Sequence, residues 1–273
     1  MHPNRILLLT DYGMRDGYPA ILKGVIWTLA PQAELADLTH EIPAQDVWSG
    51  ALTLSQSVPY FPAGTIFLAV VDPGVGTARR PLAARLGEYI FVAPDNGLLS
   101  LVLEQAERTN LPVEMVHLNQ PRFWHAPVSH TFHGRDIFAP VAAHLANGVP
   151  LSELGEPLSD PVRLPFPRAV RIPRGWQGEV IHVDSFGNLA TNLGLEHLHL
   201  HQMPQSQPPD PSRVKLEIAG IQIDGMVQTF GDRLSGALTA LIDSAGALSI
   251  VMVNGSAARL LDVGVGEPVM LSL

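Results

Sequence analysis

The chain has 273 residues, with 46% hydrophobic and 16% charged side chains, a formal net charge of −9 and no cysteine. Its length fits one large domain or two, its acidic charge argues against nucleic acid as a partner, and the lack of cysteine excludes disulfides, thiol catalysis and thiolate-bound metals. No apolar run reaches the roughly 20 residues of a membrane span and the N-terminus does not resemble a signal peptide, so we expect a cytoplasmic protein.

Strands and helices alternate over the first ~150 residues, a length typical of one domain. Short apolar runs bounded by Gly, Pro or Asp predict strands, and apolar residues at helical spacing predict helices. In chain order we expect strand 6–10, helix 18–29, strand 33–38, helix 46–58, strand 65–71, strands 81–86 and 89–92, helix 98–106, strand 113–118 and helix 136–146. This alternation predicts an α/β domain with a mainly parallel sheet and helices on its faces.

A second domain of different character is predicted after a Pro- and Arg-rich stretch. We place the first domain at 1–160, a linker at 161–177 and the second domain at 178–273. Beyond the linker we expect short strands at 179–184, 214–219, 221–223, 247–253 and 267–273, with a helix at 256–261. Short strands separated by turns predict a smaller, all-β, barrel-like domain.

Two carboxylates directly follow predicted strands. Asp11 is the second residue of the motif TDYG, which follows the first strand. Asp72 precedes the Gly/Pro turn in the motif VDPGVGTARR, and this turn can bring Arg79 back toward Asp72. If the sheet is parallel, the carboxyl ends of its strands share one edge, where such sheets bind ligands. We therefore predict that Asp11 and Asp72 line one site. The alternatives are a helix N-cap for Asp11 and a surface ion pair for Asp72 and Arg79.

A histidine lies in the motif TFHGRD, just before the predicted helix 136–146. His133 is a candidate for proton transfer because imidazole titrates near neutral pH, and the alternative is a structural histidine that caps the helix. His125, His130 and Asp136 are further metal donors nearby, but their spacing matches no well-marked zinc pattern, so we expect no metal. Three alternating histidines beside a polar loop are expected at the surface: His197, His199 and His201.

The motif VDSFGNLATN carries an aromatic ring between two hydrogen-bonding side chains. Asp184, Phe186 and Asn188 suit a polar heterocycle or an amino-acid ligand, since a ring can stack and polar groups can orient it. The alternative is an ordinary hairpin turn, because Ser, Gly and Asn favour turns. The chain contains no GxGxxG motif, P-loop or GxSxG elbow, so nucleotide-phosphate binding and serine hydrolysis are unsupported.

In their order along the chain, these loops resemble the S-adenosylmethionine (SAM) hydroxide adenosyltransferases, hydrolase relatives of the fluorinating and chlorinating adenosyltransferases. The resemblance runs through TDYG, DPGVGTARR, APDNGLL, TFHGRDIFAP, VDSFGNLATN and VNGSAARLL. It implies an N-terminal α/β domain, a C-terminal β-barrel and a homotrimer whose substrate lies between one subunit's first domain and its neighbour's second. The apolar composition separately favours buried subunit interfaces.

The resemblance also implies roles for individual residues. The implied catalytic residues are Asp72, Arg79 and His133, with Arg80 a non-catalytic neighbour. The implied substrate contacts are Asp11 at the ribose, and Asp184, Phe186, Asn188, Ser244 and Asn254 in the second domain. Two positions depart from the halogenating relatives: Ala245 replaces an arginine beside the serine, and Gln45 stands where they carry a tryptophan.

The implied reaction is hydrolysis of SAM to adenosine and methionine, with no metal or redox cofactor. Methionine leaves a sulfonium as a neutral group and needs no general acid, so the enzyme's task is to hold a water in line with the departing sulfur. Two alternatives are a halide-using adenosyltransferase and a non-catalytic protein that binds adenosine or SAM.

Overall fold

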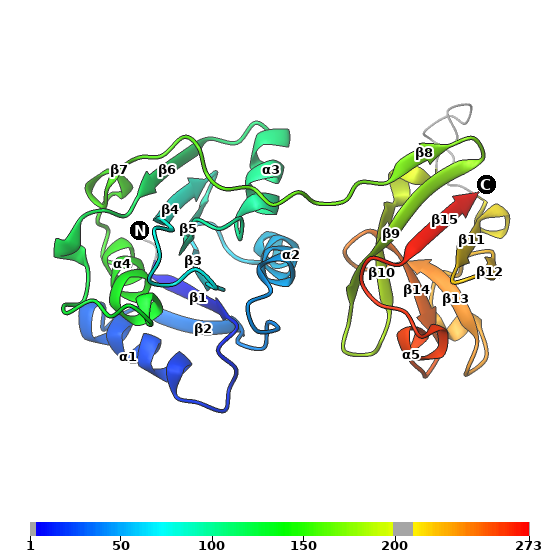
Figure 1. Cartoon of the computed structure of the whole chain (residues 1–273), viewed down its shortest axis with the longest axis horizontal. Coiled ribbons are helices and arrows are strands. Elements are labelled where there is room, and N and C mark those ends of the chain that lie inside the picture. The colour runs from blue at the N-terminus through cyan, green and yellow to red at the C-terminus, as the bar shows by residue number, and fades with distance from the viewer. Residues whose placement is uncertain (1–3, 199–209, 273) are drawn as a thin grey trace. The chain divides into compact units, whose positions relative to one another are not determined.

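The computed structural model describes residues 4–198 and 210–272. The chain divides into two compact units, Met1–Leu164 and Pro165–Leu273, and Figure 1 shows the helices and strands of each.

A mixed β-sheet forms the centre of the first unit. Its described strands are β1 (Arg5–Thr10), β2 (Glu34–Thr39), β3 (Ile66–Val70), β4 (Pro81–Leu86), β5 (Tyr89–Pro94), β6 (Val113–His117) and β7 (Glu156–Pro157). They lie in the order β2-β1-β3-β5-β4-β6-β7. The neighbours from β2 to β5 are parallel, whereas β5-β4, β4-β6 and β6-β7 are antiparallel. The prediction of a mainly parallel sheet was therefore wrong.

The hairpin between β4 and β5 explains this difference. Only two residues, Gly87 and Glu88, separate the two strands, and Gly87 has a positive φ of 58°. A two-residue connection can join only antiparallel strands, because a parallel pair requires a crossover of a dozen or more residues. The two adjacent strands predicted at 81–86 and 89–92 were correct, but their closeness in sequence already excluded a parallel arrangement.

Helices cover both faces of this sheet: α1 (Tyr18–Leu29), α2 (Val47–Ser57), α3 (Ser100–Arg108) and α4 (Ala139–Ala146). Helix α1 packs with α4 and α2 packs with α3, one pair on each side of the sheet in Figure 1. The Asp46 side chain caps α2 by accepting a hydrogen bond from the Ser49 amide at 3.0 Å, as its position predicted. The helix predicted from residue 136 instead begins with a π-helical turn, Gly134–Phe138, that leads into α4.

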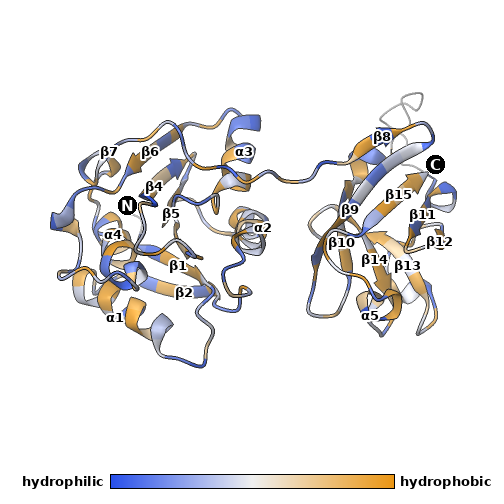
Figure 2. Cartoon of the chain, viewed as in Figure 1, coloured by the Kyte–Doolittle hydropathy of each residue, from blue (hydrophilic) through white to orange (hydrophobic). Residues whose placement is uncertain are grey.

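The core of the first unit lies between the sheet and its helices. All five residues of β3 are buried, and Figure 2 shows the hydrophobic colour concentrated on the central strands. Side chains alternate between the two faces of a strand, so Leu68 and Val70 join the cluster beneath α1 and α4 while Phe67 stacks on Phe91 on the other face. Helices on both faces require such continuously apolar strands.

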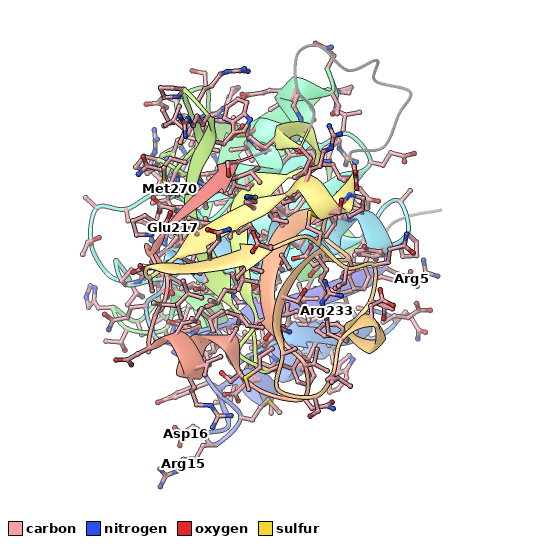
Figure 3. The ribbon with its side chains drawn as sticks, turned by 90° about the vertical axis from the view of Figure 1, so that its right-hand side faces the viewer. Arg5, Arg15, Asp16, Glu217, Arg233 and Met270 are labelled. Carbon is pink, nitrogen blue, oxygen red and sulfur yellow. The ribbon has the colours of Figure 1, made fainter. Side chains whose placement is uncertain are left out.

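The second unit is a nearly closed antiparallel sheet. Its described strands are β8 (Val170–Ile172), β9 (Gly175–Val183), β10 (Leu189–Gly194), β11 (Lys215–Ile218), β12 (Ile221–Asp224), β13 (Leu238–Ile242), β14 (Ala247–Met252) and β15 (Pro268–Ser272). The short helix α5 (Ala257–Leu261) lies between β14 and β15 in the chain. The order is β12-β11-β15-β9-β10-β14-β13, with β8 on β9, and the two end strands approach each other. In Figure 3, Glu217 and Met270 mark the paired strands β11 and β15. This is the barrel-like all-β domain that was predicted.

None of the helices in the described part of the chain is both long and apolar enough to cross a membrane.

Candidate functional site

The pairing of β1 with β3 places two polar loops side by side. Thr10 pairs with Val70 in these parallel strands, so Asp11 and Tyr12 leave the sheet beside Val71 and Asp72. Both loops lie at the carboxyl end of the parallel part of the sheet, where open α/β sheets place their ligands. Because β1 and β3 belong to that parallel part, the mixed character of the whole sheet does not disturb this edge.

The turn after β3 folds Arg79 back onto Asp72. The Arg79 Nε donates to Asp72 Oδ1 at 3.0 Å and its Nη2 donates to Oδ2, and the two side chains are only 7% and 6% exposed. The turn depends on Gly76, whose φ is +77°, because a Cβ there would lie 2.2 Å from the His130 carbonyl oxygen. The pair is therefore buried, which excludes the surface ion pair considered as an alternative.

The same guanidinium also reaches His133. Arg79 Nη2 lies 3.0 Å from His133 Nδ1, and an arginine nitrogen can only donate, so Nδ1 is the acceptor and the neutral ring carries its proton on Nε2. Burial, and next the positive charge of Arg79, lower the pKa of His133 below its ordinary value. The ring of Phe138, in the π-helical turn, lies 5.2 Å from the guanidinium carbon.

The cluster of Asp72, Arg79 and His133 leaves one donor without a protein partner. Among the described residues, Arg79 Nη1 is buried and makes no hydrogen bond. Burial raises the pKa of the Asp72 carboxyl, while the charge of Arg79 and its hydrogen bonds oppose that rise. A buried guanidinium whose Nη1 group has no partner, beside a carboxylate that can accept further hydrogen bonds, suits a small polar ligand such as water.

A second buried carboxylate, Asp136, orders the loop that carries His133. Its side chain is fully buried and accepts from Arg135 Nε at 2.6 Å, from Arg135 Nη2 at 3.0 Å and from the Ser129 amide at 2.8 Å. His125 lies 3.9 Å from it with a half-exposed side chain. The described part of the chain contains no group of three His, Asp or Glu side chains arranged to hold a metal ion.

Asp11 holds the end of the neighbouring loop between β2 and α2. Its Oδ2 accepts from the Gln45 backbone amide at 2.8 Å, and Gln45 has a positive φ of 65°. Asp11 is not a helix cap, since α1 begins at Tyr18 and its N-cap residue is Gly17. The departure noted at Gln45 thus lies in direct contact with the predicted ribose-binding carboxylate.

In the second unit, Asp184 and Asn188 bind each other in the hairpin turn between β9 and β10. Asp184 Oδ1 accepts from the Phe186 and Asn188 amides, both at 2.9 Å, and its Oδ2 accepts from Asn188 Nδ2 at 2.8 Å. The hairpin-turn interpretation is therefore correct for the backbone. The same turn presents the Phe186 ring, which is 75% exposed, and so leaves it available for stacking.

The remaining predicted contacts fall at two different ends of β14. Asn254 follows β14 and lies near the hairpin turn, because the Ala258 amide donates to the Gly187 carbonyl at 3.0 Å. Ser244 lies in the turn that precedes β14, which has six residues, or roughly 17–20 Å of strand. One ligand that contacts Ser244 and Phe186 must extend along that strand. His197 accepts from the Gly194 amide at 2.9 Å, and His199 and His201 lie outside the described residues.

Sequence reasoning did not single out Tyr12, although it stands inside the motif TDYG. Its ring packs edge-on against Phe132 at 5.8 Å and Tyr18 at 5.9 Å, beside Asp72 and His133. Nothing in the sequence indicated a buried hydrogen bond next to this loop, between Thr10 Oγ1 and His40 Nδ1 at 2.8 Å. The signal for Tyr12 was its position two residues after a strand that ends beside β3.

Comparison with known proteins relates both units to one family. Residues 6–155 match the SAM hydroxide adenosyltransferase N-terminal domain, and residues 178–270 match the C-terminal domain of the same family. The chain is 43% identical over 265 residues to an (R)-S-adenosyl-L-methionine hydrolase of Salinispora tropica, covering 96% of this chain and 95% of the relative. It is 31% identical over 215 residues to a fluorinase of an Actinoplanes species, covering 69% and 71%.

A solved structure supports the same relationship. The crystal structure of an uncharacterized conserved protein from Thermotoga maritima superposes with a TM-score of 0.89 at 34% sequence identity, covering 98% of this chain and all of that one.

Proposed function

The chain belongs to the SAM hydroxide adenosyltransferase family, and we propose that it hydrolyses S-adenosyl-L-methionine to adenosine and L-methionine. The observation that carries this proposal is the buried cluster of Asp72, Arg79 and His133, in which Arg79 Nη1 has no partner among the described residues. The relatives' name specifies the (R) sulfonium, and we propose the same epimer as the preferred substrate.

The cluster activates and orients the attacking water. The water donates one hydrogen bond to the Asp72 carboxylate and accepts one from Arg79 Nη1, which leaves its other lone pair for C5′ of the ribose. The O–C5′ bond forms as the C5′–S bond breaks, its electron pair leaves with the sulfur of methionine, and the water's proton passes to Asp72 and then to solvent. His133, neutral and hydrogen-bonded through Nδ1, holds the Arg79 guanidinium in place.

Substrate binding uses groups from both units. Asp11, at the carboxyl end of β1, accepts hydrogen bonds from the ribose hydroxyls, and its charge favours a cationic sulfonium. The exposed ring of Phe186 stacks on the adenine, with Asn188 and Asn254 beside it and Asp184 holding the turn. Ser244 lies at the far end of β14, at a distance suited to the methionine end of an extended ligand.

Water, and not halide, is the nucleophile in this proposal. An anion about 4 Å from a carboxylate is repelled by about 4 kcal/mol at an effective dielectric constant near 20, and Arg79 cancels only part of the field of Asp72. A water gains from the same carboxylate because it can donate to it. This observation favours hydrolysis over the halide transfer of the fluorinase relative.

Isotope labelling tests the proposal directly. Reaction in ¹⁸O-labelled water should place the label on the 5′-oxygen of adenosine, and added chloride or fluoride should leave adenosine as the sole nucleoside product. Recovery of a 5′-halo-adenosine as the main product, or of unlabelled adenosine, would exclude the mechanism. Binding of SAM without any turnover would favour the non-catalytic alternative.

We further propose a homotrimer that works in the cytoplasm without a metal, with each substrate held by two subunits. Large apolar side chains on α1 support an interface there, since Ile21 and Trp27 are 41% and 50% exposed. The separation of the predicted contacts over two compact units supports a site completed by a neighbouring chain.

A further inference from the structure

We propose that Tyr12 is a further catalytic residue, whose hydroxyl oxygen accepts the second hydrogen of the attacking water. This inference rests on the proposed hydrolysis at Asp72, Arg79 and His133. It concerns a side chain to which the family resemblance assigns no role.

The position of the Tyr12 hydroxyl follows from its contact with Gly134. A Cβ built on Gly134 would lie 2.4 Å from the Tyr12 hydroxyl oxygen, so this oxygen rests directly against the backbone of the residue after His133. On the other side, Tyr12 leaves β1 beside Asp72, because Thr10 pairs with Val70. The hydroxyl therefore rests on the loop of His133, the backbone of Tyr12 lies beside the loop of Asp72, and the charges of Asp72 and Arg79 both act on the phenol.

The ring of Tyr12 is held firmly in this position. It packs edge-on against Phe132 at 5.8 Å and against Tyr18 at 5.9 Å, and these two rings also contact each other at 5.2 Å. Its backbone amide donates to Thr10 Oγ1 at 3.2 Å, and Thr10 Oγ1 is itself 2.8 Å from His40 Nδ1. The hydrogen bond that the structure gives Tyr12 is made by this backbone amide and does not involve the hydroxyl.

The hydroxyl orients the water and does not deprotonate it. Burial, and next the charges of Asp11 and Asp72, raise the pKa of Tyr12 above its ordinary value, with Arg79 opposing, so the phenol stays neutral at physiological pH. A neutral oxygen accepts the water's second hydrogen while Asp72 receives the first. With both hydrogens and one lone pair engaged, the remaining lone pair points toward C5′. Tyr12 keeps its own proton throughout.

The test compares Tyr12→Phe with Tyr18→Phe, since Tyr18 belongs to the same aromatic group and is 47% exposed. Tyr12→Phe should lower kcat by about 10- to 100-fold while the Kd of the product adenosine changes less than about twofold, because only an interaction with the reacting water is lost. Tyr18→Phe should keep wild-type kcat. A Tyr12→Phe enzyme with kcat within twofold of wild type would overturn the inference.

A second comparison tests the position of the hydroxyl without using activity. Gly134→Ala should lower Tm, because the new Cβ would collide with the Tyr12 hydroxyl oxygen. The next nearest atoms, Tyr12 Cζ at 3.3 Å and Leu22 Cδ2 at 3.4 Å, are far enough from this Cβ that removing the oxygen relieves most of the collision. The double variant Tyr12→Phe with Gly134→Ala should therefore recover part of the lost Tm. No recovery would show that the hydroxyl lies elsewhere.

These outcomes separate the inference from the proposed function. If wild-type enzyme releases adenosine and Asp72→Asn does not, while Tyr12→Phe is fully active, the role of Tyr12 is wrong and the hydrolysis stands. If wild-type enzyme releases no adenosine, the proposed function itself is wrong.

Discussion

Asp72, Arg79 and His133 use Nε and Nη2 of Arg79 for hydrogen bonds among themselves and leave the buried Nη1 group of Arg79 for a ligand. Such an unpartnered donor costs about 1–3 kcal/mol of stability when no ligand satisfies it. The expected compensation is a bound water or substrate group. This arrangement makes the proposed role of the three side chains sensitive to changes of single atoms.

Asp72→Asn and His133→Ala should each lower kcat far more than they weaken substrate binding. Asparagine keeps the shape of aspartate but loses the charge that accepts the water's proton, so we expect a loss on the order of 10²-fold or more in kcat. Steady-state kinetics with SAM measure this. Asp16→Asn, an exposed carboxylate on the loop after β1 (Figure 3), is the control and should keep normal turnover. Near-normal kcat in Asp72→Asn would refute the role of Asp72.

The rate should fall as pH is lowered, because two groups of the cluster then take up a proton. The proposed mechanism needs Asp72 ionised and His133 neutral, so protonation of either group should inactivate the enzyme. Burial raises the pKa of Asp72 from 3.8 and, together with Arg79, lowers the pKa of His133 from 6.5, so the two values converge. As pH falls, kcat/KM should decline only below about pH 6.5, the ordinary histidine value. A profile that already declines above pH 7 would contradict this protonation scheme.

The turn after β3 carries two neighbouring arginines whose side chains bind different carboxylates. Arg79 turns inward to Asp72, whereas Arg80 Nε donates to Asp95 at 2.8 Å and its Nη1 and Nη2 donate to Asp160 at 2.8 and 2.7 Å. Asp95, with a side chain only 1% exposed, also accepts from the Val162 amide at 2.8 Å. Arg80 thus joins the turn after β3 to the segment where the first unit ends.

Arg80→Ala should therefore leave kcat nearly unchanged but destabilise the first unit. Removing the guanidinium leaves the buried Asp95 carboxylate without its charged partner, which we expect to cost about 1–3 kcal/mol in unfolding free energy. Denaturant unfolding measures this. Arg163→Ala is the matched control, because its pair with Glu107 is 42% and 51% exposed and should contribute less than about 1 kcal/mol. An equal loss of kcat in Arg79→Ala and Arg80→Ala would show that the turn has been misinterpreted.

At the scale of the whole molecule, each unit has its own apolar core, and the residues proposed to bind substrate are divided between the two. A site built from two separately folded units can be completed within one chain or between chains. Complementation between inactive variants distinguishes these cases.

Mixing Asp72→Asn with Asn188→Ala should restore activity if subunits exchange. In a trimer whose sites use two chains, some sites then combine an intact Asp72 with an intact Asn188, whereas a site within one chain always keeps one defect. Adenosine release after mixing is the measurement, and either variant alone is the control. An active monomer in light scattering would exclude the proposed assembly.

The sequence by itself determined most of the elements and the loops that carry polar side chains. The helix predicted at 18–29 is α1, the strand predicted at 65–71 contains β3, and the Asp46 cap is present. These features depend on the periodicity of neighbouring residues and on local breakers such as Pro31, which the chain displays directly. β10 was missed because its Asn and Gly residues disfavour a strand locally, and its pairing with β9 and β14 outweighs that preference.

Only the tertiary structure decided which side chains meet. The direction of β4, the inward turn of Arg79 rather than Arg80, and the place of Tyr12 against Gly134 all depend on contacts between residues far apart in the chain. Local propensity carries no information about such contacts, because their free energy comes from burial and pairing that exist only once the sheet has formed. For that reason the motif TDYG pointed to Asp11, whereas the packing around β1 and β3 brought Tyr12 into the site.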